Sequence, residues 1–331
     1  MNRLSGKQVE RPYLSVIAVV CCIGLGGIGH WGVASEAYAA DLRIEKDDST
    51  VSIFDGDRLV LRYRYGNVPM KPYVDQLLSP AGTQILRDSP HDHKHHHGLM
   101  YALAVDGVDF WGEVDASYGK EEHKSLRDVK HAVRDGDSFA GFVEELNWVG
   151  PGSDRPLLVE RRAVGVRQDS DLSATLVEWQ CRIETPPGKD SISLTGSHYF
   201  GLGMRFLPSM DSGGRHFNAD DKPGEVVRGD EWLTAVKWCA YAAKADGKPV
   251  TVAIFDHPDN LRHPAKMFTM STPFAYLSAT LDLWKQPITV TAGHALELSY
   301  GVALWDGEVD KATVEKCYQR WLKLNPVEAK R

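Results

Sequence analysis

The chain has little cysteine and no excess of positive charge, and both shortages restrict what it can be. Only five of its 331 residues are cysteine, too few and too scattered for a disulfide framework. We expect Cys181, Cys239 and Cys317 to be buried as small apolar side chains. Acidic residues outnumber basic ones by 45 to 38, and the net charge of −7 argues against a nucleic-acid partner.

Long apolar runs are also scarce, and the one that stands out is near the N-terminus. Three basic residues precede the apolar stretch 14–25, and an Ala-x-Ala motif ends at Ala39. This order is typical of a secretory signal. We therefore expect residues 1–39 to be a signal peptide and residues 40–331 to be a periplasmic or secreted protein. An uncleaved membrane anchor is the alternative, but no later segment has 18 consecutive apolar residues, so no further span is expected.

The rest of the sequence is dominated by short alternating segments separated by turns. In residues 58–65, apolar side chains alternate with Arg62 and Arg64, as in a half-buried strand. Asp-Gly pairs, which supply the positive φ angles of a tight hairpin, separate several of these segments. They lie at residues 55–56, 106–107, 135–136 and 246–247. The pattern predicts a mainly β protein in which residues 40–331 form one large antiparallel β-sandwich.

One segment, residues 309–324, has the periodicity of a helix. Its apolar positions follow the spacing of one helical face: they are Val314, Cys317, Tyr318, Trp321 and Leu322. Asp306 or Asp310 could cap its N-terminus. We expect a C-terminal helix that covers an edge or a face of a sheet.

The most distinctive feature is a run of five histidines between residues 91 and 97. If this stretch is extended, every second side chain shares one face, so His91, His93 and His97 lie together. Imidazole titrates near neutral pH and is a common metal ligand. We predict catalytic roles for these three residues, and we expect His91 and His93 to be the ligands if one divalent metal ion is bound. The competing interpretation is a solvated loop that binds metal adventitiously.

A second constellation, residues 254–264, follows a predicted strand. We expect Asp256 and His257 at the end of that strand, where Asp256 can orient an imidazole or accept a proton. Two His-Pro steps favour an extended, stiffened loop. The segment predicts catalytic roles for Asp256 and His257, and substrate binding by Arg262 and His263. A polar turn held by internal hydrogen bonds is the alternative.

Three further residues complete the predicted site. His198 lies in the glycine-rich segment 196–203, where a strand without side chains lets a ligand approach the backbone. We predict that His198 is catalytic, although a hydrogen-bonded core histidine is the competing interpretation. Arg87 and His123 are predicted to bind substrate, with Arg87 as a positive group that can stabilise developing charge.

Several segments together resemble a bacterial family catalogued as methane oxygenase PmoA. They are residues 71–73, 79–82, 90–99, 109–113, 199–203 and 255–264. One departure is His97, where that family often has Arg. The order of hairpins and the late segment 291–300 also resemble the galactose-mutarotase-like β-supersandwich, which implies that fold for this chain.

The broader resemblance implies an exported carbohydrate-active protein, either epimerase- or mutarotase-like or lyase-like. In the first type, a carboxylate and an imidazole exchange protons with the sugar. In a lyase, a base removes the proton next to a carboxylate while a cation or Arg stabilises the charge. Two alternatives stay open, a noncatalytic carbohydrate-binding protein and a metal-dependent oxygenase, as the name of the resembling family suggests. The expected partner is a small or polymeric carbohydrate.

Overall fold

The computed structural model describes residues 42–134, 137–169 and 171–325. The predicted signal peptide and the predicted turn at residues 135–136 lie outside the described residues. The chain separates into two units, residues 1–37 and 38–331, and every described residue belongs to the second. The described part of the chain is mostly β, as the alternating segments predicted.

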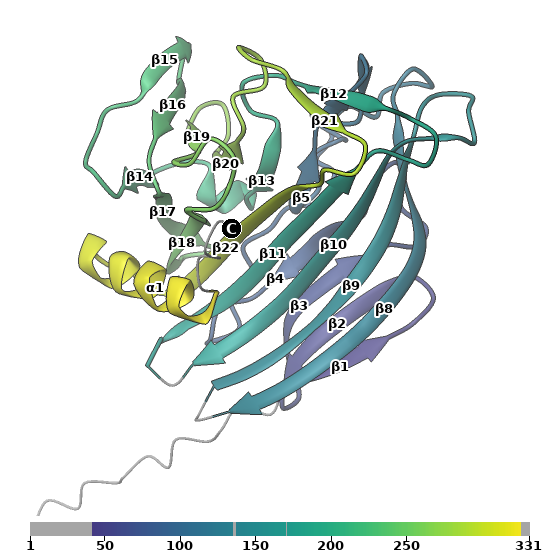
Figure 1. The fold of residues 1–331 in the computed structure, drawn as a ribbon. Helices are drawn as coiled ribbons and strands as arrows, with labels where there is room; N and C mark the ends of the chain where they lie inside the picture. The colour runs from purple at the N-terminus through teal and green to yellow at the C-terminus, as the bar shows by residue number, and fades with distance from the viewer. Residues whose placement is uncertain (1–41, 135–136, 170, 326–331) are drawn as a thin grey trace, which may run out of the picture. The chain divides into compact units, whose positions relative to one another are not determined.

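The larger sheet of the described chain has ten strands, paired antiparallel throughout (Figure 1). In spatial order these are β1 (Leu42–Lys46), β2 (Thr50–Asp55), β3 (Arg58–Arg64), β4 (Tyr73–Leu77), β5 (Leu99–Ala102), β13 (Gly201–Arg205), β20 (Tyr276–Thr280), β19 (Lys266–Met270), β16 (Glu231–Ala235) and β15 (Glu225–Arg228). The central strands β5, β13 and β20 are therefore neighbours in space although they are far apart in the chain.

Two further antiparallel sheets complete the described β-structure. The eight-stranded sheet contains β14 (Arg215–Asn218), β17 (Trp238–Ala245), β18 (Lys248–Asp256), β22 (Leu296–Asp306), β11 (Ala174–Glu184), β10 (Pro156–Asp169), β9 (Asp137–Val149) and β8 (Lys120–Arg134). The four-stranded sheet contains β21 (Ile288–Thr291), β12 (Ser191–Thr195), β6 (Ala104–Val105) and β7 (Val108–Asp109). Outside the sheets, the short 3₁₀-helix η1 (Pro208–Met210) follows β13.

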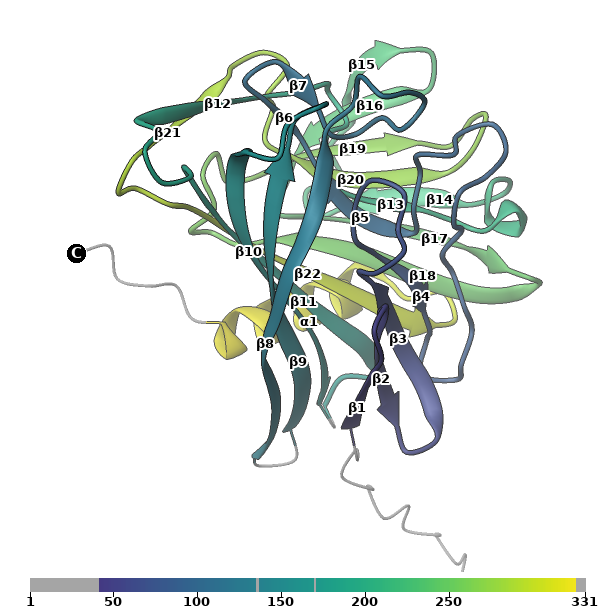
Figure 2. The same cartoon turned by 90° about the vertical axis from the view of Figure 1, so that its right-hand side faces the viewer.

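The two large sheets pack face to face (Figure 2). The core between them contains many aromatic side chains. Tyr63 of β3 contacts Phe142 of β9 and Trp179 of β11, with ring centroids 5.0 and 6.3 Å apart. Tyr101 of β5 reaches Trp148 of β9 at 6.4 Å. Strands that alternate apolar and polar side chains bury one face in this way. The predicted antiparallel sandwich is confirmed.

The strand register decides which side chains lie on the outer face of the ten-stranded sheet. Leu202 of β13 pairs with Tyr101, so these two residues share the face that points into the core. Because side chains alternate along a strand, Gly203 and Arg205 both lie on the opposite, outer face of the sheet. Arg205 pairs with Tyr276 of β20 across this face.

The C-terminal helix α1 (Lys311–Leu324) covers the outer face of the eight-stranded sheet (Figure 1). Asp310 caps it, with its carboxylate accepting a hydrogen bond from Thr313 N at 2.8 Å. Trp321 and Tyr318 are buried against Phe255 of β18. The predicted helix, its cap and its packing are confirmed.

The turns and the cysteines also follow the sequence. Asp106 and Gly107 have φ angles of 50° and 84°, and Asp246 and Gly247 have 48° and 84°, as tight hairpin turns require. Cys181, Cys239 and Cys317 are free and buried. Among the helices that are described, none is both long and apolar enough to cross a membrane.

Candidate functional site

The histidine segment is folded into turns, so the expectation that alternate histidines share a face is wrong. His93 N donates to Pro90 O at 3.0 Å, and His96 N donates to His93 O at 2.9 Å. These turns bring side chains three positions apart together, and the rings of His93 and His96 stack with centroids 4.7 Å apart. His91 is exposed, and His97 is buried in different surroundings.

His97 lies at the centre of a buried ion network. Its Nδ1 lies 2.6 Å from Asp88 Oδ1, and its Nε2 lies 2.9 Å from Glu113 Oε2. Lys71 Nζ donates to Glu113 at 2.5 Å. Tyr73 donates to Asp88 at 2.9 Å and stacks its ring on His97. With a carboxylate at each ring nitrogen, both nitrogens act as donors, which only the charged imidazolium provides.

The electrostatics of this network hold His97 in its charged form. Burial would lower the pKa of His97, but the hydrogen bonds to Asp88 and Glu113 outweigh it and raise the pKa. Burial would raise the pKa of Asp88 and of Glu113, but their bonds to His97 lower both. Position 97 therefore carries a fixed positive charge, as Arg would, and neither ring nitrogen is free to exchange a proton with a ligand.

His96 points to the outer face of the ten-stranded sheet, where aromatic rings surround it. Its ring centroid lies 5.2 Å from that of Tyr276 and 6.2 Å from that of Trp111. Phe274 contacts both His93 and His96. We call the following residues the sheet-face site: His93, His96, Trp111, Arg205, Phe274 and Tyr276.

Gly203 makes room for the hydroxyl of this site. A Cβ at position 203 would lie 2.4 Å from Tyr276 Oη. The absence of a side chain lets the Tyr276 ring lie flat over β13, in the centre of the sheet.

Several polar atoms of the sheet-face site are buried and have no hydrogen-bond partner among the described residues. They are His96 Nδ1, Trp111 Nε1, Tyr276 Oη, Arg205 Nε and Arg205 Nη1. Buried polar groups are nearly always paired, because an unpaired one loses its hydration without compensation. Their concentration in one place indicates a position where a polar ligand completes the bonding.

Burial keeps two of the histidines here neutral. It lowers the pKa of His96 to about 2 and that of His95 to about 4, with further lowering by nearby positive groups. A neutral imidazole has one donor nitrogen and one acceptor nitrogen. His93 has a half-buried side chain, and its Nδ1 lies 3.1 Å from Asp92 Oδ2.

Asp256 is buried at the end of β18 and ties down the loop that follows. Its Oδ1 accepts a hydrogen bond from Asn260 Nδ2 at 2.7 Å. Its Oδ2 accepts from His263 Nδ1 at 2.6 Å and from Ala265 N at 2.7 Å. The structure therefore brings Asp256 and His263 together, with the carboxylate orienting the imidazole as predicted.

His257 and Arg262 bond to the backbone. His257 Nε2 donates to Asn325 O at 2.8 Å, just beyond helix α1. The Arg262 guanidinium donates to three carbonyls between residues 281 and 287, at 2.6 to 3.2 Å. Both side chains thus hold neighbouring segments in place.

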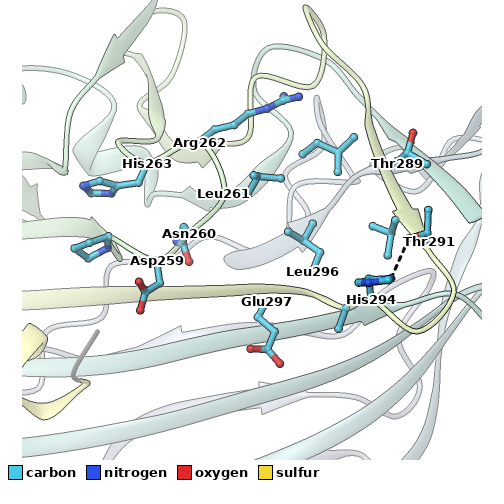
Figure 3. A pocket seen from close by; sticks show the side chains of 14 residues that line it. Asp259, Asn260, Leu261, Arg262, His263, Thr289, Thr291, His294, Leu296 and Glu297 are labelled. Atoms are coloured by element: carbon cyan, nitrogen blue, oxygen red, sulfur yellow. Dashed lines mark hydrogen bonds between the residues drawn. The ribbon is translucent and has the colours of Figure 1, made fainter. Parts of the chain in front are cut away.

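A groove of about 620 Å³ lies between the loop 258–263 and the hairpin that joins β21 to β22 (Figure 3). His263 lies at one end, and His294, 3.3 Å from Thr291 Oγ1, lies at the other. Leu261 and Leu296 form an apolar part of its wall. The sheet-face residues do not line this groove.

Of the remaining predicted residues, two border the sheet-face site and one does not. His198 pairs with Glu231 at 2.7 Å and reaches Trp111 through the ring of Tyr199. Arg87 donates its backbone N–H to Arg205 O at 2.9 Å. His123 of β8 lies elsewhere, 2.7 Å from Glu144.

The predicted metal ligands His91 and His93 have no third ligand beside them among the described residues. Within the described residues, no three His, Cys, Asp or Glu side chains are grouped so that they could hold a metal ion. His91 and His93 would therefore need ligands from outside this part of the chain.

Sequence reasoning missed Arg205 and Tyr276 and assigned no role to His96. A signal for Arg205 is present, because Gly201, Gly203 and Arg205 occupy alternate positions of one strand. Because side chains alternate along a strand, Arg205 lies on the same face of β13 as Gly201 and Gly203. Tyr276 joins the site only through the pairing of β13 with β20, which no local pattern predicts.

Known structures resemble the chain at low sequence identity. The α-galactosidase from Lactobacillus brevis has 8% identity and a TM-score of 0.48, over 86% of this chain and 42% of that one. A GH36 α-galactosidase from Geobacillus stearothermophilus has 10% and 0.44, over 80% and 41%. A galactose mutarotase-like protein from Clostridium acetobutylicum has 9% and 0.38, over 81% and 99%. The chain spans less than half the length of these α-galactosidases.

Sequence comparison identifies the family. No curated protein matches the chain, and the resemblance to the methane oxygenase PmoA family finds no support. The model of a family of unknown function, DUF6807, matches residues 50–319. Because this match covers most of the sequence, the chain belongs to the DUF6807 family.

Proposed function

We propose that this chain is a carbohydrate-active protein that binds a sugar at the sheet-face site. The observation that supports the proposal is the set of unpaired buried polar atoms on His96, Trp111 and Tyr276. A sugar carries several hydroxyls, which can pair with such atoms, and apolar C–H faces, which pack against aromatic rings. Because these atoms are buried, sugar binding in this proposal requires the side chains that cover them to move.

Proton transfer in the proposed reaction belongs to the imidazoles. The carboxylates of Asp88 and Glu113 are occupied by His97. His93 is accessible from solvent and its ring stacks on that of His96, so its imidazole is placed to take up a proton from a bound sugar and return it. Such transfer serves an epimerase- or mutarotase-like reaction and equally a lyase-like one.

The test is a panel of neutral and acidic sugars scored for both binding and turnover. Anomeric exchange or epimerisation is followed by NMR, and elimination by the ultraviolet absorbance of an unsaturated product. The double variant His93→Ala/His96→Ala is compared with His294→Ala, which removes an exposed histidine at the Figure 3 groove. We expect the double variant to lose about 100-fold or more in turnover, the usual contribution of general acid–base catalysis, while His294→Ala behaves as wild type.

Three results would overturn parts of the proposal. Full turnover in the double variant excludes the imidazoles as proton carriers. If wild type turns over no sugar, but binds one and the double variant binds it more weakly, the protein is a noncatalytic carbohydrate-binding protein. A panel without any binding contradicts the carbohydrate assignment itself.

We also propose that the protein acts outside the cytoplasm, as a periplasmic or secreted protein. The support is the order of basic residues, apolar stretch and Ala-x-Ala motif in residues 1–39.

A further inference from the structure

We infer that Arg205 binds a carboxylate of the ligand, with Arg87 as a second positive group, so that the sugar is an acidic one of the hexuronate class. The sugar part of this inference rests on the proposed function. The anion part rests on the surroundings of Arg205 alone.

Arg205 is a buried cation, and no described residue gives it a hydrogen-bonded anion. It is 1% exposed, and its Nε and Nη1 have no acceptor in the part of the chain that the structure describes. Asp211 Oδ2 lies 3.8 Å from Arg205 Nη2, which is beyond hydrogen-bond distance. A guanidinium taken out of water without acceptors is unfavourable, and an anionic ligand would remove that penalty.

Arg205 and Arg87 share a single carboxylate as their nearest ion-pair partner. The same Asp211 oxygen lies 3.9 Å from Arg87 Nη1, so two guanidinium groups share one carboxylate. The other Asp211 oxygen accepts a hydrogen bond from Ala275 N at 3.0 Å. Asp92, the other acid that interacts with Arg205 electrostatically, lies beside His93. A carboxylate of the ligand would therefore supply the hydrogen-bond acceptors that the shared Asp211 does not give to Arg205.

The arginine is also held in a fixed orientation. Its guanidinium lies 3.5 Å from the centroid of the Phe274 ring. Its backbone is paired within the central strands, with N donating to Gly98 O at 2.8 Å and O accepting from Arg87 N at 2.9 Å. A planar guanidinium fixed by stacking binds a carboxylate with defined geometry, which the point charge of lysine does not do.

The position of the anion selects between the two reaction types left open above. A lyase-like reaction needs a positive group beside the carboxylate, where it stabilises the charge that develops when the neighbouring proton is removed. Arg205 and the accessible imidazole of His93 flank Phe274. The arrangement therefore favours β-elimination from an acidic sugar. The His93 imidazole takes the proton from the carbon next to the carboxylate, a C=C double bond forms to the next carbon as the C–O bond there breaks, and the leaving oxygen takes up the proton from the imidazolium.

The experiment compares binding of D-galacturonate and D-glucuronate with that of D-galactose, D-glucose and sodium acetate by calorimetry. The variant is Arg205→Met, and the matched control is Arg182→Met, which removes a positive charge from the exposed side of β11. We expect wild type and control to bind a uronate at least about tenfold more tightly than its neutral counterpart, as charge-assisted hydrogen bonds provide. Arg205→Met loses this preference and keeps or raises the melting temperature, because it removes an unpaired buried charge.

The outcomes separate this inference from the proposed function. If neutral sugars bind as tightly as uronates, or if Arg205→Met keeps the preference for uronates, the carboxylate inference is overturned and the sugar site stands. If acetate binds as tightly as the uronates and Arg205→Met abolishes both, the anion site stands and the carbohydrate assignment fails.

Discussion

The histidines between residues 91 and 97 occupy three different environments. His91 is exposed, His93 and His96 stack at the sheet-face site, and His97 is enclosed by carboxylates. The sequence predicted that the segment carries functional side chains, but it did not predict which histidine lies in which environment. The directions of these side chains depend on the turns at His93 and His96. Because the segment has no alternation of apolar and polar residues, its sequence does not predict which turns form.

His97 should behave as a structural cation whose contribution to stability depends on pH. Its pKa is raised in the folded state above the ordinary value of 6.5. The charged form thus stabilises the fold fully below pH 6.5, and this contribution is lost as the pH rises through the folded-state pKa. In denaturant titrations, His97→Arg should gain stability relative to wild type between pH 6 and pH 9, because arginine stays charged.

A second variant tests the network without a change of pH. His97→Gln leaves the buried carboxylate of Glu113 and the partly exposed carboxylate of Asp88 with a neutral partner, and should lower the free energy of unfolding by about 3 kcal/mol. A pH-independent difference between His97→Arg and wild type, or a fully stable His97→Gln, would contradict the network.

At the scale of elements, local patterns predicted the hairpins and helix α1 well. The Asp-Gly turn at 246–247 and the capping residue Asp310 specify backbone conformations directly, so they are visible in the sequence. The loop after β18 is different. Asp256, His257 and Arg262 are all polar, and polar residues in a loop indicate a ligand site and an internally bonded turn equally well. Only their bonds to backbone atoms distinguish the two.

Asp256 offers a test of that distinction. In Asp256→Asn, the amide replaces an oxygen that accepts hydrogen bonds from His263 and Ala265. We expect a loss of about 1 to 3 kcal/mol in the free energy of unfolding, as for buried donors left unpaired. Turnover at the sheet-face site, measured well below the melting temperature, should stay within a few-fold of wild type. Unchanged stability together with abolished turnover would place Asp256 in the chemistry.

At the scale of the whole molecule, an antiparallel sandwich was predictable but its strand order was not. Alternation shows that a strand has one buried face, yet it does not show which strand lies beside it. The site depends on that order, because β5, β13 and β20 meet only in the folded sheet. This is why Tyr276 could not be associated with the histidine segment from the sequence.

Export is a prediction at this scale. When the full chain is expressed with its own N-terminus in a bacterial host, the periplasmic or secreted fraction should contain a protein that begins at Ala40. Intact-mass spectrometry of each fraction measures this directly. A full-length product retained in the membrane fraction would instead support an uncleaved anchor.

The bare backbone at Gly203 links two positions that are distant in the sequence. Because a Cβ there would lie 2.4 Å from Tyr276 Oη, the two residues compete for the same volume. Relatives that carry alanine at the position of Gly203 should have lost the phenol opposite it, and those that keep the phenol should keep glycine. Gly203 and Tyr276 are therefore expected to change together among relatives, because a side chain at position 203 would displace the phenol ring from the sheet.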